Sequence, residues 1–312
     1  MITSFELVFP ILAVILAGYI AARFQILNHE SGSLLCQYLF YFSIPFLTFS
    51  NIYGVGLDNL LNARFILAVV LTLLIVIPTA YFVFRFGFKL KNEDLVMMIF
   101  GSYYINVGYM GIPIASLLLN SVIPVMIILV MQASFLFPLT VFMMDLKTGG
   151  NKSINLKDTL LILVKNPILL SSLIAILSLV LKIEYPEIVL RTTDLLGRPA
   201  STVGLFALGF TCYLPAERRI TALEMKQALT ATFIKIIYHP LVAWLVGKYV
   251  FNLDRWWLIA IVVSAMLPTA VNHFIVSLRY RCNENASKLI ILFTTFGFTI
   301  VMSIFLYLIG GI

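Results

Sequence analysis

Charge is what this sequence has least of. Only 11% of its 312 residues are Asp, Glu, Lys or Arg, whereas 61% are apolar, and the mean hydropathy is +1.03. Globular domains are about 25% charged and about 45–50% apolar, and a soluble monomer of this size could not bury so much apolar surface. The composition excludes a water-soluble protein and predicts a polytopic membrane protein.

Long polar stretches are scarce as well. Ten spans of roughly 20 residues would leave about 112 residues for loops and ends, too few for a separate soluble domain. A membrane β-barrel is excluded because its strands alternate polar and apolar residues instead of running apolar for the length of a helix. The beginning MITSFELVFP has no Lys or Arg before the first apolar run, so we expect a retained span and not a cleavable signal peptide.

Cysteine is rare, and its spacing suggests no special chemistry. Cys36, Cys212 and Cys282 form neither a CxxC pair nor a metal-ligand pattern. We therefore expect no metal and no cofactor.

Ten apolar runs separate at clusters of charge and at helix-breaking residues. Each run has about the length that a transmembrane helix needs, which predicts an all-α fold. The runs cover residues 5–23, 31–53, 63–87, 95–119, 121–144, 160–182, 189–213, 225–250, 256–279 and 286–311.

The basic residues predict the direction of the chain. With the N-terminus outside, the inner loops hold 13 Lys and Arg and the outer loops hold 6, leaving out Lys165 and Lys235 inside the runs. Inner loops of membrane proteins carry such an excess, so we expect both termini outside a plasma or bacterial inner membrane. The net charge of +7 is then a topology signal and not a sign of a nucleic-acid partner.

The polar connector from Asp145 to Asp158 divides the ten runs into two sets of five. Because five is odd, the two sets have opposite orientations, which is the inverted-repeat plan of secondary transporters. We expect a first repeat at residues 1–145, a cytoplasmic linker at 146–158 and a second repeat at 159–312. Three proline pairs recur 155 to 162 positions apart: Pro10 with Pro167, Pro78 with Pro240, and Pro113 with Pro268.

The fourth and ninth runs do not read as plain helices. The fourth contains GSYYINVGYMGIP, residues 101–113, and the ninth contains MLPTAVNHF, residues 266–274. Gly and Pro interrupt helices, and interruptions at matching places in two repeats indicate a central binding site; two structural kinks are the alternative. The candidate substrate-binding residues are Asn106, Gly108, Gly111, Pro113, Pro268, Thr269, Asn272 and His273.

Acidic residues are missing from the middle of the runs. All fourteen lie at run ends or in loops, which disfavours proton or Na⁺ carriage on a buried Asp pair. The charge expected within the membrane is instead basic, at Lys235 and His239 and at His273 if its ring is protonated. Lys235 could extend to the inner surface or have a functional role, and His273 could be a bystander. Asn, Thr and helix N-termini without carboxylates suit an anion.

At these residues the sequence resembles the auxin efflux carrier family, which includes plant PIN proteins and bacterial organic-acid permeases. The resemblance covers nearly the whole chain. The matching stretches are GSxxxNxGxxGIP from Gly101, LPTAVN from Leu267, YFSIPFLTF around Pro45, KIIYHPLVAWLVG from Lys235 and GLFALGFT from Gly204.

The resemblance implies a fold of ten helices in two inverted five-helix repeats. Helices 1, 2, 6 and 7 would form a scaffold, and helices 3–5 with 8–10 a transport domain. Helices 4 and 9 would cross at their proline breaks, where an organic anion binds. His273 follows the motif of the ninth helix but is not a family residue. The short connector resembles the bacterial branch, whose members carry malate, malonate or related acids.

The sequence therefore predicts a secondary transporter that moves a small organic carboxylate by alternating access, without coupling through a buried carboxylate. Its expected partners are the anion, the lipid bilayer and a second copy bound through scaffold helices. The alternatives are a Na⁺-coupled organic anion symporter of the bile-acid type and an anion sensor that transports nothing. An enzyme is not expected, because the runs contain no Ser–His–Asp, HExxH or paired-acid pattern.

Overall fold

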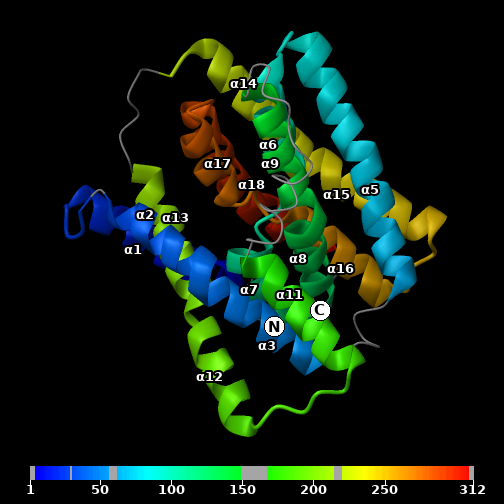
Figure 1. The fold of residues 1–312 in the computed structure, drawn as a ribbon. Coiled ribbons are helices and arrows are strands. Elements are labelled where there is room, and N and C mark those ends of the chain that lie inside the picture. Colours follow the sequence, from blue (N-terminus) through cyan, green and yellow to red (C-terminus); the bar gives the residue numbers. More distant parts are fainter. Residues whose placement is uncertain (1–3, 29, 56–61, 149–166, 214–219, 309–312) are drawn as a thin grey trace.

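Helices make up the part of the chain that the computed structural model describes, which is residues 4–28, 30–55, 62–148, 167–213 and 220–308. Within these ranges no strand occurs, apart from one isolated β-bridge. Most of the expected linker at 146–158 and the beginning of the sixth apolar run lie outside the described residues. Figure 1 shows helical segments that cross one another at large angles.

Each predicted apolar run contains helix within the described residues. In the first half the elements are α1 (Ser4–Arg23), α2 (Ser31–Tyr38), the π-helical turn η1 (Leu39–Ser43), α3 (Ile44–Val55), α5 (Ala63–Phe82), η2 (Val83–Gly87), α6 (Asn92–Tyr103), η3 (Val107–Gly111), α7 (Ile112–Leu119), α8 (Ile123–Met131), η4 (Gln132–Leu136) and α9 (Phe137–Thr148).

The second half continues the same pattern. Its elements are α11 (Pro167–Val180), α12 (Glu187–Gly197), α13 (Pro199–Tyr213), α14 (Ala222–Phe233), η5 (Ile234–Tyr238), α15 (His239–Leu245), η6 (Val246–Val250), α16 (Arg255–Met266), α17 (Asn272–Tyr280) and α18 (Glu284–Leu308).

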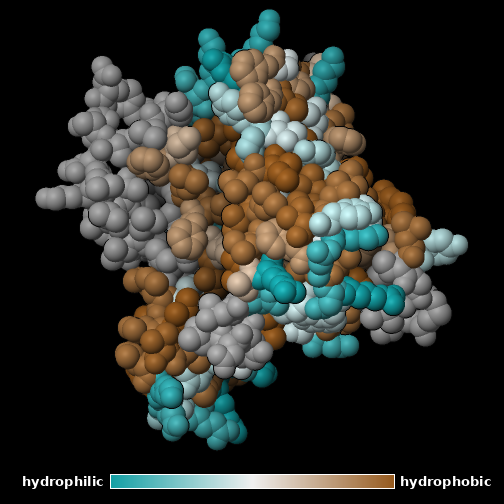
Figure 2. Space-filling view, turned by 90° about the vertical axis from the view of Figure 1, so that its right-hand side faces the viewer, coloured by the Kyte–Doolittle hydropathy of each residue, from teal (hydrophilic) through white to brown (hydrophobic). Residues whose placement is uncertain are grey.

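Four continuous helical stretches in the described part are long and apolar enough to cross a membrane: Ser31–Gly54, Ala63–Gly87, Ala222–Val250 and Glu284–Leu308. Large apolar side chains point outward from them, among them Leu74 at 64% and Ile300 at 63% exposure. Figure 2 shows one such face as a broad brown area, with teal gathered at its upper edge and in a second group across its lower part. This distribution suits a multi-pass membrane protein, whose outer surface meets lipid.

Polar residues at the helix starts supply hydrogen-bond acceptors to the first backbone N–H groups. Thr221 and Glu224 form a reciprocal capping box at α14, and the Asp254 carboxylate accepts from the N–H groups of Trp256 and Trp257 at α16. Such caps satisfy donors that have no partner inside the helix. They explain why these two helices begin where the hydrophobic runs meet polar sequence.

Glycines allow α1 and α13 to approach each other closely. A Cβ at Gly18 of α1 would overlap the Phe206 carbonyl of α13, and a Cβ at Gly209 of α13 would overlap the Ile15 carbonyl of α1. Close backbone approach at glycine is typical of helix pairs in membranes. Nearby along the chain, α3 packs against α11 and α12 of the second half.

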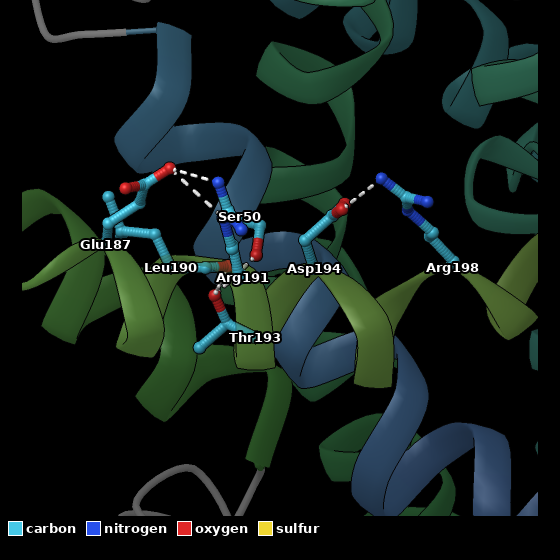
Figure 3. A network of polar contacts seen from close by, with 7 residues as sticks. All are labelled: Ser50, Glu187, Leu190, Arg191, Thr193, Asp194 and Arg198. Atoms are coloured by element: carbon cyan, nitrogen blue, oxygen red, sulfur yellow. Dashed lines mark hydrogen bonds and ion pairs between the residues drawn. The ribbon is translucent and has the colours of Figure 1, made fainter.

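The seventh run differs from its prediction. Instead of one apolar helix at 189–213, the structure has α12 and α13, divided at Arg198. One side of α12 exposes the ion pairs Glu187–Arg191 and Asp194–Arg198, whereas Thr193 faces α3 and accepts a hydrogen bond from the Ser50 hydroxyl at 2.9 Å (Figure 3). The charges make α12 amphipathic, and the hydropathy of the run as a whole conceals this division.

Candidate substrate pocket between two interrupted helices

The fourth apolar run is interrupted earlier than its sequence predicts. α6 ends at Tyr103, residues 104–106 are not helical, and the π-helical turn η3 leads directly into α7. Gly108 and Gly111 belong to that turn, and Pro113 is the second residue of α7. The break therefore precedes the glycines and the proline that we expected to form it.

The ninth run is interrupted at the motif itself. α16 ends at Met266, and α17 begins at Asn272. Pro268 and Thr269 lie between these two helices, and both are buried.

The two interruptions pair with each other. Ile105 and Thr269 form an antiparallel β-bridge. The Asn106 N–H donates to the Pro268 carbonyl at 2.8 Å, and the Ala270 N–H donates to the Tyr104 carbonyl at 3.2 Å. Unwound backbone at membrane depth needs partners of this kind, so each break supplies hydrogen-bonding groups to the other.

Two predicted site residues hold the broken helices together. The Thr269 hydroxyl donates to the Gly101 carbonyl at 2.7 Å, and the Thr269 N–H donates to Thr294 Oγ1 of α18 at 3.1 Å. His273 of α17 lies with Nε2 2.8 Å from the Met97 carbonyl of α6. Both side chains are fully buried, and these contacts assign them to packing around the break.

A pocket opens beside the paired breaks. It encloses about 470 Å³, including the open space at its mouth. Three predicted site residues line it, namely Asn106, Gly108 and Asn272, whereas the other five do not. The full lining is Ile44, Tyr104, Ile105, Asn106, Val107, Gly108, Leu129, Gln132, Ala133, Phe137, Ala270 and Asn272.

The pocket has the polarity that a small anion needs. Asn272 is the first residue of α17, and the N-terminus of a helix attracts negative charge. Asn106 and Gln132 bring amide groups, and the Tyr104 side chain is hydrogen-bonded to Asn272. No charged side chain is among the lining residues, so a bound carboxylate would meet neutral donors.

Sequence reasoning missed Tyr104 and Gln132. Gln132 is 2% exposed and stands in the stretch IPVMIILVMQASFL, whose only other polar residue is Ser134. A lone amide in a membrane run is costly and commonly functional. That rule could have identified Gln132 before the structure was known.

A second pocket adjoins the first. It encloses about 340 Å³ and shares Ile105 and Gln132 with the first pocket; His239 and Ala265 are among its other lining residues. Next to it, Lys235 of η5 is completely buried, and its Nζ donates to the Ala265 carbonyl at 2.7 Å and lies 3.4 Å from His239 Nδ1. Lys235 therefore points into the protein and does not extend to a membrane surface.

Comparison with known proteins shows the family of this chain. The family model described as "Membrane transport protein" matches residues 3–306. Over 308 residues the chain is 29% identical to the "Putative malonate transporter" of Rhizobium meliloti (strain 1021), covering 97% of this chain and 95% of that protein. Over 311 residues it is 22% identical to the "Uncharacterized transporter YfdV" of Escherichia coli (strain K12), covering 96% and 95%. The chain belongs to the membrane transport protein family, the auxin efflux carrier family that its motifs resemble, which is a family of transporters and not of enzymes.

Proposed function

We propose that this protein is a secondary transporter that moves a small organic carboxylate, of the malonate type, across the cell membrane by alternating access. The observation that carries the proposal is the pocket between the two interrupted helices. Asn272 at the start of α17 and the amides of Asn106 and Gln132 border it, and no carboxylate competes with a bound anion. The name of the Rhizobium relative supports malonate as the first anion to test.

We further propose ten membrane spans in two inverted repeats, residues 1–145 and 159–312, with both termini outside. Helix packing supports this symmetry. α1 of the first half packs on α13 of the second, and α11 of the second half packs on α3 of the first. These two contacts exchange when the halves are exchanged, as an inverted repeat requires. The interrupted helices also correspond, because α6 and α16 are both 12 residues long.

The same contacts support a division into two moving parts. α1 to α3 and α11 to α13 form the proposed scaffold, and α5 to α9 with α14 to α18 form the proposed transport domain. The substrate pocket lies at their border, since Ile44 of α3 lines it together with Ala133 of η4. In alternating access, movement of the transport domain past Ile44 would expose the bound anion first to one side and then to the other. A dimer through the scaffold stays a prediction.

Energy coupling follows from the chemistry of the two pockets. No Asp or Glu lines either one, so an exchangeable buried carboxylate is lacking there. A Na⁺-coupled mechanism of the bile-acid type would need free oxygen ligands at the breaks. The carbonyl oxygens of Tyr104, Pro268 and Gly101 already accept hydrogen bonds, which favours uniport or anion exchange over Na⁺ symport.

The test is counterflow in proteoliposomes. Vesicles loaded with unlabelled malonate are diluted into labelled malonate, and we expect transient accumulation of label in vesicles that contain the protein. Accumulation distinguishes a transporter from a sensor that only binds. If a panel of mono- and dicarboxylates stabilises the protein against heat but none shows counterflow, the sensor alternative replaces this proposal.

A further inference from the structure

The two half-helices that end at the break have different partners at their C-termini. At the end of α6, the Gly101 carbonyl accepts from the neutral hydroxyl of Thr269. At the end of α16, the Ala265 carbonyl accepts from the amine of Lys235 at 2.7 Å. Ala265 is the penultimate residue of α16, and the last carbonyls of a helix carry partial negative charge.

In transporters with broken helices, half-helix C-termini and unwound carbonyls are the places that hold a coupling cation. From this placement we infer that Lys235 is a built-in cation: its ammonium occupies the position at the end of α16 that a free monovalent cation would otherwise take. This inference rests on the proposed function. A built-in cation would explain why the proposed transporter needs neither Na⁺ nor a buried acid.

The Lys235 amine lies close to two groups that can accept its hydrogen bonds. Its side chain is 0% exposed, and the π-helical turn η5 that carries it packs against α6, α16 and α18. The nearby ring nitrogen, Nδ1 of His239, is 3.4 Å away and accepts a hydrogen bond from the amine in the tautomer that carries its proton on Nε2. Intramembrane lysines are stabilised by such carbonyl and ring acceptors when no carboxylate is present.

The adjacent cavity shows where a free cation would go if Lys235 were shortened. His239 and Ala265 both line the second pocket, together with the polar side chains of Thr72, Tyr103 and Gln132. Removing the lysine side chain would join its volume to this pocket. A small cation with some of its water could then reach the Ala265 carbonyl.

The inference assigns opposite charges to the two sides of the break. The end of α16 holds a fixed positive charge, and the start of α17 faces the pocket for the negative substrate. Lys235 is a positioning residue in this account, because its contact is with Ala265 and not with the substrate. Without a cation the negative end of α16 would oppose an anion bound near the break.

The experiment measures malonate counterflow in N-methyl-D-glucamine, sodium, potassium and methylammonium chloride at equal osmolarity. For the wild type we expect equal rates in all four salts. For Lys235→Ala we expect a rate lower by about tenfold or more in N-methyl-D-glucamine, because the half-helix end has lost its charge. Sodium or methylammonium should restore much of the rate to Lys235→Ala.

Lys248→Ala is the matched control, since Lys248 is an exposed lysine at the end of the same helical stretch. This variant should behave as the wild type.

A thermal-shift measurement with the same salts separates this inference from the proposed function. Small cations should raise the melting temperature of Lys235→Ala relative to N-methyl-D-glucamine and should not do so for the wild type, whatever the substrate is. If neither the wild type nor the variants show counterflow, malonate transport is rejected. The effect of small cations on the melting temperature of Lys235→Ala would still test the role of Lys235. The inference is overturned if Lys235→Ala transports normally without small cations, or if the wild type itself requires Na⁺ or K⁺. The second outcome needs no variant, so it overturns the inference even if Lys235→Ala fails to fold.

Discussion

The backbone N–H of Asn106 donates to the carbonyl oxygen of Pro268 at 2.8 Å. This bond joins the interruption of the fourth apolar run to that of the ninth, and it places one wall of the pocket at the point where the two breaks meet. Asn106 lines the pocket and Pro268 does not, so the proline acts on the pocket through its carbonyl and through the local course of the backbone.

We expect Pro268→Ala to impair transport more than folding. Alanine would let α16 continue past Met266, because it restores the N–H that proline lacks, and the Asn106 contact would shift. A displacement of about 1 Å at a binding site can cost roughly 100-fold in rate. Pro113→Ala is the comparison, and its cost should be smaller because Pro113 lies in the first turn of α7. Counterflow rates set against melting temperatures measure both effects; equal loss in the two variants would contradict this assignment.

The amides of the pocket should bind the carboxylate of the substrate. Removing one hydrogen bond to a charged group costs about 1.5–3 kcal/mol, so we expect Asn106→Ala and Asn272→Ala each to weaken malonate binding by roughly tenfold or more. Isothermal titration or ligand-dependent thermal shift gives the affinity. Gln37→Ala removes an exposed amide on α2 and should leave affinity unchanged. Unaltered affinity in both pocket variants would move the binding site elsewhere.

His273 should matter for stability and not for proton coupling. Its Nε2 donates to the Met97 carbonyl if the proton is on that nitrogen, and Nδ1 then has no hydrogen-bond partner among the described residues. His273→Ala would leave the buried Met97 carbonyl without this donor, which costs about 1–3 kcal/mol. We therefore expect His273→Ala to melt at a lower temperature than His273→Gln, which keeps a donor. Transport by His273→Gln with the same pH dependence as the wild type would agree with this role. A pH dependence that disappears in His273→Gln would give the ring a part in coupling.

The thiol of Cys282 should react slowly. Cys282 lies between α17 and α18, and burial, followed by the negative charges of Asp94, Glu93 and Glu284, raises its pKa to about 12. The thiolate is the nucleophile, so a raised pKa leaves the neutral, unreactive form at neutral pH, and reactivity increases as the pH rises toward that value. The measurement is N-ethylmaleimide labelling of a protein that carries Cys36→Ala and Cys212→Ala.

A matched protein provides the reference rate for that labelling. Ser33→Cys in a background without the native cysteines places an exposed thiol on α2. At about pH 8 it should be labelled quickly, because an ordinary thiol is partly ionised there. Equal rates for Cys282 and this thiol would show that the loop around Cys282 opens readily.

Membrane potential should drive the distribution of the transported anion. With no Asp or Glu lining the pockets, the anion would carry its own charge, and its accumulation should follow the voltage at roughly 2.3 kcal/mol per 100 mV for each negative charge that it carries. Flux into proteoliposomes is measured while the voltage, pH and Na⁺ gradients are varied one at a time. Accumulation driven by a pH or Na⁺ gradient at zero voltage would overturn this prediction.

The sequence predicted the candidate site in part, and the differences have physical causes. The structure interrupts the ninth run at 267–271, inside the stretch 266–274 that the sequence singled out, because Pro268 cannot donate the hydrogen bond that the interior of a helix requires. The sequence misplaced the break in the fourth run, because Gly108, Gly111 and Pro113 can also be accommodated in a π-helical turn and the first turn of a helix. Gly and Pro show that a helix can be interrupted nearby, but not at which residue.

The sequence by itself determined that this chain is a membrane protein of apolar helices and, through its motifs, the family to which it belongs. Hydropathy and helix length act along the chain, so they can be read locally. Only the tertiary structure decided which groups meet at the break: Asn106 with Pro268, and Lys235 with Ala265. A buried polar group takes its partner from whichever element packs across from it, and that element can lie far away along the chain.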